Sequence, residues 1–439
     1  MLKVIFLLVL TVALAACGQS DNRPDINITA EEITLDIWYL WPHENRVVGW
    51  FAPRFQDSNP HIIVNTRNFG NDWEQYNEQL PLALAAGTAP DLFITDFLDY
   101  WDPNINNHLA DWFPIMQAQN VNPNDWFMNV IHAPTTPGRL YAFPTRFNFT
   151  MVAANTLIPG LVDDLGQTAG ITSIDLIEFA RHSGQVLYAH QLFTVGGGVG
   201  IRNFIDMDTR TADFNNQAFV DAITFAKELS PSNPAFFGFI IGDEQIHLTT
   251  NLQELEYSQR YMFLQLIPRY TQYFLSIDNL LFQGRTPFVN SRGELAINRQ
   301  TSWSISANTS PEQRQAAWDF VKFMQDPKLL DLVPLTAPFM VSTYKPLMRF
   351  EFTRSVPGET QFAANNWQFE GTREDLIAGG IAELERIAGM PVAIDARIPR
   401  NISNIWWDVL EKFESGYITA WDAAETLQDR VTLALREMD

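Results

Sequence analysis

The chain has 439 residues, 46% of them hydrophobic, which exceeds one ordinary hydrophobic core and predicts two domains. Its 51 acidic and 29 basic residues give a formal net charge of −22, which argues against nucleic acid or a strongly anionic molecule as partner. The single cysteine excludes an internal disulfide, so core packing has to stabilise the fold.

The first 17 residues have the pattern of an export signal. Lys3 precedes the apolar stretch Val4–Ala13, which is too short to cross a bilayer because a spanning helix needs about 20 apolar residues. Leu14-Ala15-Ala16-Cys17 then resembles the bacterial lipobox, in which the cysteine is lipidated after removal of the signal peptide. An ordinary signal peptide with an incidental cysteine is the alternative.

This resemblance implies a signal peptide over 1–16 and a lipidated Cys17. Residues 17–32 are polar, lack a hydrophobic period and are expected to form a flexible tether. We therefore expect a protein anchored by lipid to the outer face of the bacterial cell membrane, extracellular or periplasmic.

Residues 33–94 predict three strands alternating with two helices. Residues 33–39 alternate with period two, and the apolar runs 62–64 and 92–94 are typical of buried strands. The helices carry apolar stripes at Val47, Val48, Phe51 and Phe55, and at Trp73, Tyr76, Leu80 and Leu84. This order predicts right-handed parallel units with helices on both faces, hence the α/β class.

In such sheets, ligands bind beyond the C-terminal ends of the strands. This rule places residues 39–44 and 95–101 at the candidate site. Further along the chain, Ser310-Pro311-Glu312-Gln313 predicts a helix start with a capping box. Ile405, Val409 and Phe413 mark a C-terminal helix.

Several segments together resemble the bacterial extracellular solute-binding proteins of ABC importers, of the maltose/oligosaccharide-binding type (family 1). The matching segments are Ala85–Asp91 (AAGTAPD), Gly138–Pro144 with Val152–Asn155, Phe282–Phe288, Ile305–Ala307 and Ala317–Phe323. They occur in the family's order, and the resemblance covers nearly all of residues 33–439.

The resemblance implies a type II periplasmic-binding-protein fold, in which two α/β lobes, each a mostly parallel sheet flanked by helices, are joined by hinge crossings. It places lobe one at 33–147 and 289–342, and lobe two at 148–288 and 343–439. It places the crossings near 146–150, 286–290 and 340–346. A monomeric protein is expected to capture one small solute in the cleft by hinge closure and deliver it to the ABC permease.

The resemblance and the topology together predict a ligand site for a carbohydrate. The candidate residues are Trp41, His43, Glu44, Thr95, Asp96, Asp99, Asn148 and Trp406. Carboxylates and amides can bind sugar hydroxyls in pairs, and an aromatic face covers the C–H side of a sugar ring. Trp406 lies where maltose-type relatives carry a stacking tryptophan. Trp38, by contrast, is expected in the core, and neither catalytic residue, cofactor nor metal is expected.

Three alternatives remain. Departures from the family pattern leave room for a solute other than a sugar. One example is Ser291-Arg292-Gly293-Glu294, which has no tryptophan where many sugar binders have a G-x-W. A lipoprotein that senses its ligand would have the same sequence features. An exported glycoside hydrolase could use carboxylate pairs such as Asp163-Asp164 or Asp206/Asp208, although such pairs arise by chance among 51 acidic residues.

Overall fold

The computed structural model describes the following parts of the chain: residues 32–40, 42–95, 103–132, 138–149, 151–155, 169–172, 175, 204–206, 209–229, 263–266, 282–287, 289, 292–295, 297–330, 340–356, 372–392 and 399–437. The expected signal peptide, Cys17 and the tether up to residue 31 lie outside these residues. Trp41, Asp96, Asp99, Asp208 and the pair Asp163-Asp164 also lie outside them.

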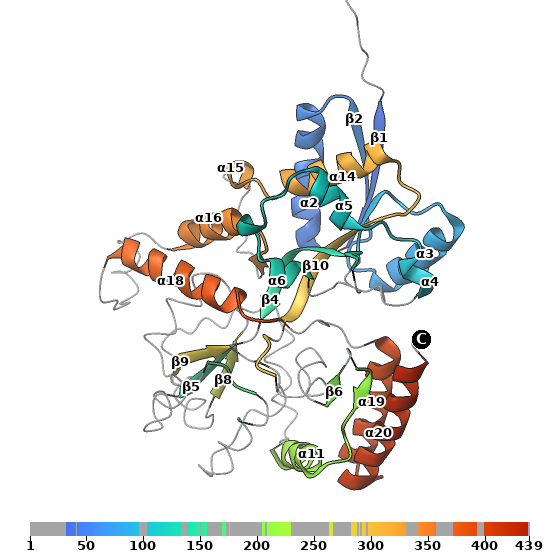
Figure 1. Cartoon of the computed structure of the whole chain (residues 1–439), viewed down its shortest axis with the longest axis vertical. Coiled ribbons are helices and arrows are strands. Elements are labelled where there is room, and N and C mark those ends of the chain that lie inside the picture. The colour runs from blue at the N-terminus through green and yellow to red at the C-terminus, as the bar shows by residue number, and fades with distance from the viewer. Residues whose placement is uncertain are drawn as a thin grey trace, which may run out of the picture.

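A six-stranded sheet forms the centre of the first lobe (Figure 1). Its order is β11 (Val341–Ser342), β4 (Phe143–Phe149), β10 (Ile297–Ile305), β3 (Leu92–Ile94), β1 (Ile33–Tyr39) and β2 (Ile62–Asn68). β1 pairs in parallel with both β2 and β3, as predicted. β10 and β11 pair antiparallel with their neighbours, so the sheet is mixed rather than mostly parallel.

Helices cover the sheet, and α2 and α3 pack on it with most residues of their predicted apolar stripes. The helices are α2 (Pro42–Ser58), α3 (Trp73–Ala86), α4 (Pro103–Asn106), α5 (Trp112–Ala118), α6 (Met128–His132), α14 (Pro311–Phe323) and α15 (Pro327–Leu330), with the 3₁₀ turn η1 (Pro123–Asp125). On α2, Val48, Phe51 and Phe55 are buried in one core cluster with strand residues such as Leu35 and Ile37. These contacts provide the hydrophobic stabilisation that the chain needs without a disulfide.

The capping box identified in the sequence takes the predicted form. Ser310 Oγ accepts a hydrogen bond from the backbone N–H of Gln313 at 3.2 Å, and Gln313 Oε1 accepts one from the N–H of Ser310 at 3.0 Å. Gly87 ends α3 with φ of 72°, a left-handed conformation that glycine adopts without steric cost. In the same segment, a carboxylate oxygen of Asp91 accepts a hydrogen bond from the N–H of Asp36 at 2.9 Å, which ties the turn to β1.

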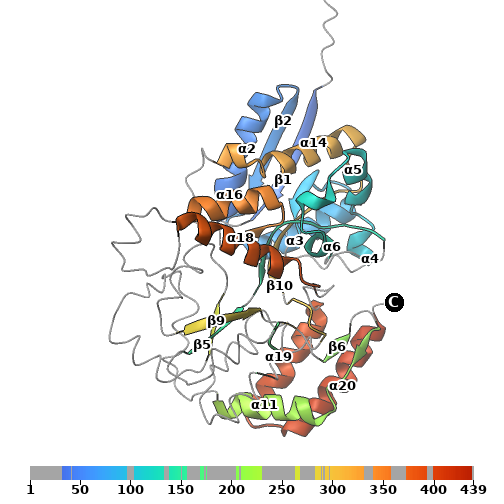
Figure 2. The same ribbon diagram turned by 60° about the vertical axis from the view of Figure 1, so that its left-hand side comes forward.

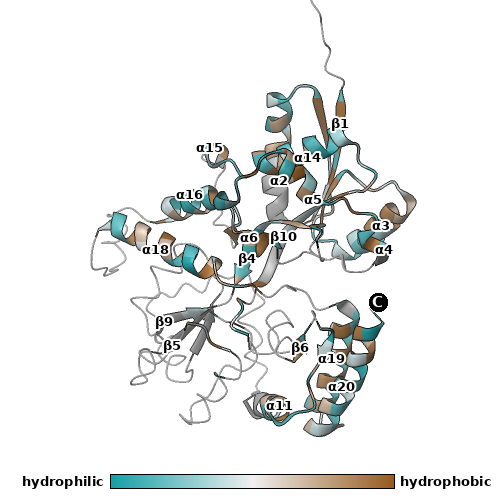
Figure 3. Ribbon diagram, in the orientation of Figure 1, coloured by the Kyte–Doolittle hydropathy of each residue, from teal (hydrophilic) through white to brown (hydrophobic). Residues whose placement is uncertain are grey.

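The second lobe contains a small sheet and a helical layer. β5 (Met151–Asn155) lies between β8 (Phe263–Leu266) and β9 (Phe282–Pro287), and β6 (Ile205–Asp206) pairs with β7 (Thr211–Ala212). All of these pairings are antiparallel, so the mostly parallel sheet expected for this lobe is not found among its described strands. α19 (Arg400–Glu414), α20 (Ala420–Arg436) and α11 (Gln217–Leu229) share one hydrophobic core. α19 and α20 each carry both hydrophobic and hydrophilic residues (Figure 3).

Two chain crossings link the first-lobe sheet to the small sheet of the second lobe. The chain passes from β4 to β5 at residue 150, and from β9 to β10 over residues 288–296. The third crossing differs from the prediction at 340–346. It lies between α18 (Arg373–Ala388) and α19, where the N–H of Leu295 donates to the carbonyl of Pro391 at 2.6 Å.

The helices α16 (Lys345–Ser355) and α18 therefore stay with the first lobe, although residues 343–439 were all assigned to the second (Figure 2). The physical reason is that β11 pairs with β4, and that Met348, Phe352 and Leu384 are buried against Phe147 in one core cluster. No helix within the described ranges is both long enough and apolar enough to cross a membrane.

Candidate ligand-binding site

The parallel strands β1, β2 and β3 end at Tyr39, Asn68 and Ile94, along the same edge of the first-lobe sheet. This edge faces the second lobe (Figure 1). The sequence rule for parallel strands therefore places the candidate site between the lobes. Tyr39 itself is part of the core, and burial raises the pKa of its hydroxyl above the ordinary value, so the side chain stays neutral.

Thr95 directly follows β3, as predicted, but its hydroxyl is engaged by the sheet. The backbone N–H of Thr95 donates to the carbonyl of Ser302 at 2.9 Å, and its Oγ1 lies 3.2 Å from the same carbonyl. Ser304 Oγ lies 3.3 Å from Thr95 Oγ1 and donates to the carbonyl of Tyr141 at 2.6 Å. The fully buried Thr95 thus contributes chiefly to the shape of this edge.

Asn148 lies on β4, immediately before the chain crosses to the second lobe. Its side chain is 5% exposed, and its Oδ1 is buried without a hydrogen-bond partner among the described residues. A buried polar atom without a partner costs about 1–3 kcal/mol, so such an atom is uncommon unless a water or ligand satisfies it. Asn148 is therefore a candidate residue with a structural sign of a missing partner.

Trp406 does not present a free ring to a cleft. Its side chain is 1% exposed and packs in the core of the helical layer, with its ring centroid 6.1 Å from that of Phe214 and 6.0 Å from that of Phe219. The neighbouring Trp407 is 41% exposed. The predicted stacking role of Trp406 is therefore corrected, because the apolar face of α19 turns this residue inward to bury it.

The other candidates are only partly located. His43 and Glu44 belong to the first turn of α2, directly beyond the end of β1, and only their backbone is described. Trp38 packs partly buried against the core cluster around α3, with its ring centroid 5.3 Å from that of Phe69, which agrees with the core role expected for it. Trp73 was not among the candidates, although it follows the end of β2 as closely as the chosen residues follow β1 and β3.

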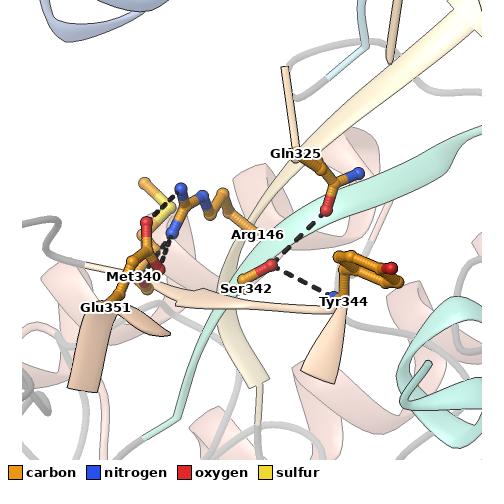
Figure 4. Close-up of polar contacts among 6 residues, drawn as sticks. All are labelled: Arg146, Gln325, Met340, Ser342, Tyr344 and Glu351. Carbon is orange, nitrogen blue, oxygen red and sulfur yellow. Dashed lines mark hydrogen bonds and ion pairs between the residues drawn. The ribbon is translucent and has the colours of Figure 1, made fainter. Parts of the chain in front are cut away.

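The first crossing is anchored by polar contacts on its first-lobe side (Figure 4). Arg146 on β4 donates two hydrogen bonds to the carboxylate of Glu351 on α16, each of 2.6 Å. Beside this pair, Ser342 Oγ donates to Gln325 Oε1 at 3.4 Å and accepts from the N–H of Tyr344 at 3.1 Å. These contacts hold β4, β11 and α16 together next to the point where the chain leaves the lobe.

The carboxylates of the described residues are not gathered into a metal site. Within the described ranges, no group of three or more His, Cys, Asp or Glu side chains is arranged to hold a metal ion. Asp206, one of the carboxylates considered for hydrolysis, lies on β6 and forms an ion pair with Arg292 at 3.3 Å.

No protein-family model matches the sequence. No curated protein sequence matches it either. The fold, in contrast, is similar to that of solved structures over 92% of this chain. The extracellular solute-binding protein family 1 from Alicyclobacillus acidocaldarius has 17% sequence identity, a TM-score of 0.58 and 99% of its own chain covered.

Two further solved structures are similar to this chain. The sugar-binding protein MalE from Xanthomonas citri has 16% identity and a TM-score of 0.59, with 98% of its chain covered. The ABC substrate-binding protein Lmo0181 from Listeria monocytogenes, solved in complex with cycloalternan, has 16% identity and a TM-score of 0.54, with 100% covered. The chain thus has the fold of these two-lobed binding proteins along almost its whole length.

Proposed function

We propose that the protein is the substrate-binding component of an ABC importer, which captures a sugar or oligosaccharide between its lobes and delivers it to a membrane permease. The main support is the fold, shared over 92% of the chain with structures that include a sugar-binding protein and a complex with cycloalternan. The chain's net charge of −22 is consistent with a neutral ligand.

Capture would proceed by hinge closure. A ligand that contacts both lobes favours the closed state by its differential affinity for that state. The two crossings from β4 to β5 and from β9 to β10 are short, and the Arg146–Glu351 pair holds the first-lobe side of one of them. The ligand would bind at the edge formed by the ends of β1, β2 and β3, with His43, Glu44 and Asn148 as candidate contacts from the described residues.

The proposed ligand class is tested by a thermal-shift screen of residues 18–439 against monosaccharides and oligosaccharides, with amino acids, peptides and polyamines as controls. A ligand at one hundred times its dissociation constant stabilises the fold by about 2.7 kcal/mol through mass action. A shift with one class of sugar, without consumption of that sugar, supports the proposal. A shift only with another solute overturns the sugar assignment, and consumption of the sugar favours the hydrolase alternative.

The proposal includes a lipid anchor at Cys17, a location on the outer face of the membrane and a monomeric protein. Cys17→Ser should release the protein from membranes into the medium or periplasm. If the variant stays with the membrane fraction, the anchor is not Cys17. Uptake of labelled ligand, compared between cells with and without the protein, separates transport from sensing. A transport role predicts that uptake is lost without the protein, whereas a purely sensory role predicts that uptake continues.

A further inference from the structure

The position of Trp73 on α3 places its indole beyond the end of the first-lobe sheet. Tyr76, Leu80 and Leu84 are buried on the face of α3 that packs on the sheet, and Trp73 continues this stripe by one turn toward the N-terminus of the helix. The hydroxyl of Tyr76 donates to the carbonyl of Ile94 at 2.6 Å, and Ile94 is the last residue of β3. The hydroxyl of Tyr76 thus lies at the C-terminal end of β3.

The direction of the helix carries Trp73 past this edge. α3 follows β2 and returns antiparallel to the strands, so its N-terminus lies at their C-terminal ends. Three residues before Tyr76 correspond to a rise of about 4.5 Å, and side chains on a helix lean toward its N-terminus. Both effects move the indole of Trp73 toward the space between the lobes.

The exposure of Trp73 differs sharply from that of its neighbours on the stripe. Its side chain is 42% exposed, whereas Tyr76 and Leu80 are fully buried. Among the described residues, no aromatic ring packs against the indole of Trp73. A large apolar ring is therefore left partly open to solvent at the edge where the ligand is expected, although the adjoining core could have covered it.

An unsatisfied polar atom lies on the same helix one turn further on. Asn77 Oδ1 is buried without a hydrogen-bond partner among the described residues, and residues four apart on a helix are neighbours. Asn77 lies one turn toward the C-terminus of α3 and is set back from the end of the sheet, so it is the exposed ring face of Trp73 that suits the C–H groups of a sugar ring.

We infer that Trp73 is the ligand-stacking residue of the first lobe and covers the C–H face of a neutral sugar ring. This inference rests on the proposed function. It assigns the stacking role to Trp73, because Trp406 is buried in the core of the second lobe and cannot stack on a ligand. The ring of Trp73 would position one sugar unit over the ends of β2 and β3. The stacking would then discriminate pyranose rings with a continuous apolar face from smaller polar solutes.

Fluorine NMR tests this inference directly. The chain contains 13 tryptophans, and labelling with 5-fluorotryptophan reports on each of them. Trp73→Phe assigns the resonance of Trp73 by its disappearance, and Trp421→Phe assigns a control of similar exposure, since Trp421 is 45% exposed on α20. The probes are glucose, maltotriose, cellotriose, xylotriose and chitotriose, each added separately. Binding of a probe should shift the Trp73 resonance and leave that of Trp421 in place.

The affinity of the probe that binds supplies the second measurement. Trp73→Ala should raise its dissociation constant at least tenfold, Trp73→Phe less, and Trp421→Ala less than twofold, with the melting temperature of each unliganded variant recorded. If a probe shifts other tryptophan resonances but not that of Trp73, or if Trp73→Ala binds it normally, the proposed function stands and the role of Trp73 is refuted. If no probe shifts any resonance and the thermal-shift screen responds only to a solute other than a sugar, the sugar-binding function itself is refuted, and the stacking role with it.

Discussion

Arg146 and Glu351 form a two-pronged ion pair that ties strand β4 to helix α16, although 205 residues separate them in the sequence. Both N–H···O distances are 2.6 Å, and Glu351 is 1% exposed. Bidentate arginine–carboxylate pairs are among the strong charge-assisted contacts in proteins. The pair lies where β4 is about to leave the first lobe, so it fixes the base of the first crossing.

Glu351→Gln should destabilise the protein by about 3 kcal/mol, because it leaves the partly buried guanidinium of Arg146 without a balancing charge. Urea unfolding measures this change. The matched control is Glu385→Gln, which disrupts the exposed pair between Arg349 and Glu385 linking α16 to α18, and which should cost about 0.5 kcal/mol. Equal effects of the two variants would contradict the anchoring role of Arg146 and Glu351.

Trp406→Ala should lower the free energy of unfolding by about 3–5 kcal/mol, since it opens a cavity between Phe214 and Phe219. Trp407→Ala, on the exposed side of the same helix, should change it by about 0.5 kcal/mol. Thermal or urea unfolding compares them. If Trp406→Ala keeps the full free energy of unfolding but no longer binds the ligand, Trp406 is a stacking residue and the core role argued from its packing is wrong.

Asn148→Leu should weaken binding of the captured sugar about tenfold, the effect of one hydrogen bond of about 1.4 kcal/mol. The unliganded protein should keep its stability, because Asn148 Oδ1 has no hydrogen-bond partner among the described residues to lose. Isothermal titration calorimetry measures the affinity. Asn129→Leu is the contrasting control, since the side chain of Asn129 donates to the carbonyls of Ala388 and Met390 and should affect stability rather than affinity.

Asp422 caps α20 together with Thr419, and hydrogen bonds from the side chain and backbone of Thr419 hold the pKa of Asp422 below its ordinary value. The folded state therefore favours the charged carboxylate. Its contribution to stability is present above about pH 4, the pKa of a free aspartate, and is lost as the pH falls through the lowered folded value.

Thr419→Val should raise the pKa of Asp422 toward the ordinary value, as followed by the carboxyl carbon chemical shift in an NMR titration. Thr372→Val serves as the control, because Thr372 forms the same capping box with Asp375 at the start of α18. It should raise the pKa of Asp375 and leave that of Asp422 in place. An Asp422 pKa that Thr419→Val leaves unchanged would assign the shift to another cause.

Local patterns along the chain determined much of the fold. The period-two alternation of β1, the apolar stripes of α2 and α3 and the capping box of α14 all depend on residues a few positions apart. The structure confirms the strand and the capping box, and it confirms the stripes at Val48, Phe51 and Phe55 and at Tyr76, Leu80 and Leu84, but not at Trp73. The parallel arrangement of β1, β2 and β3 followed from their order with the intervening helices, which restricts the connections to right-handed ones. The edge at which the ligand site is expected followed from the same order.

Only the tertiary structure decided which lobe α16 and α18 join, which tryptophan of the pair Trp406 and Trp407 faces the core, and that Arg146 meets Glu351. Each of these depends on contacts between segments far apart in the sequence. A helical pattern of apolar residues predicts that one face of the helix is buried, but it does not predict which element that face packs against. Trp73 illustrates the same limit, because its stripe predicted burial, and only the position of the sheet edge leaves its ring partly exposed.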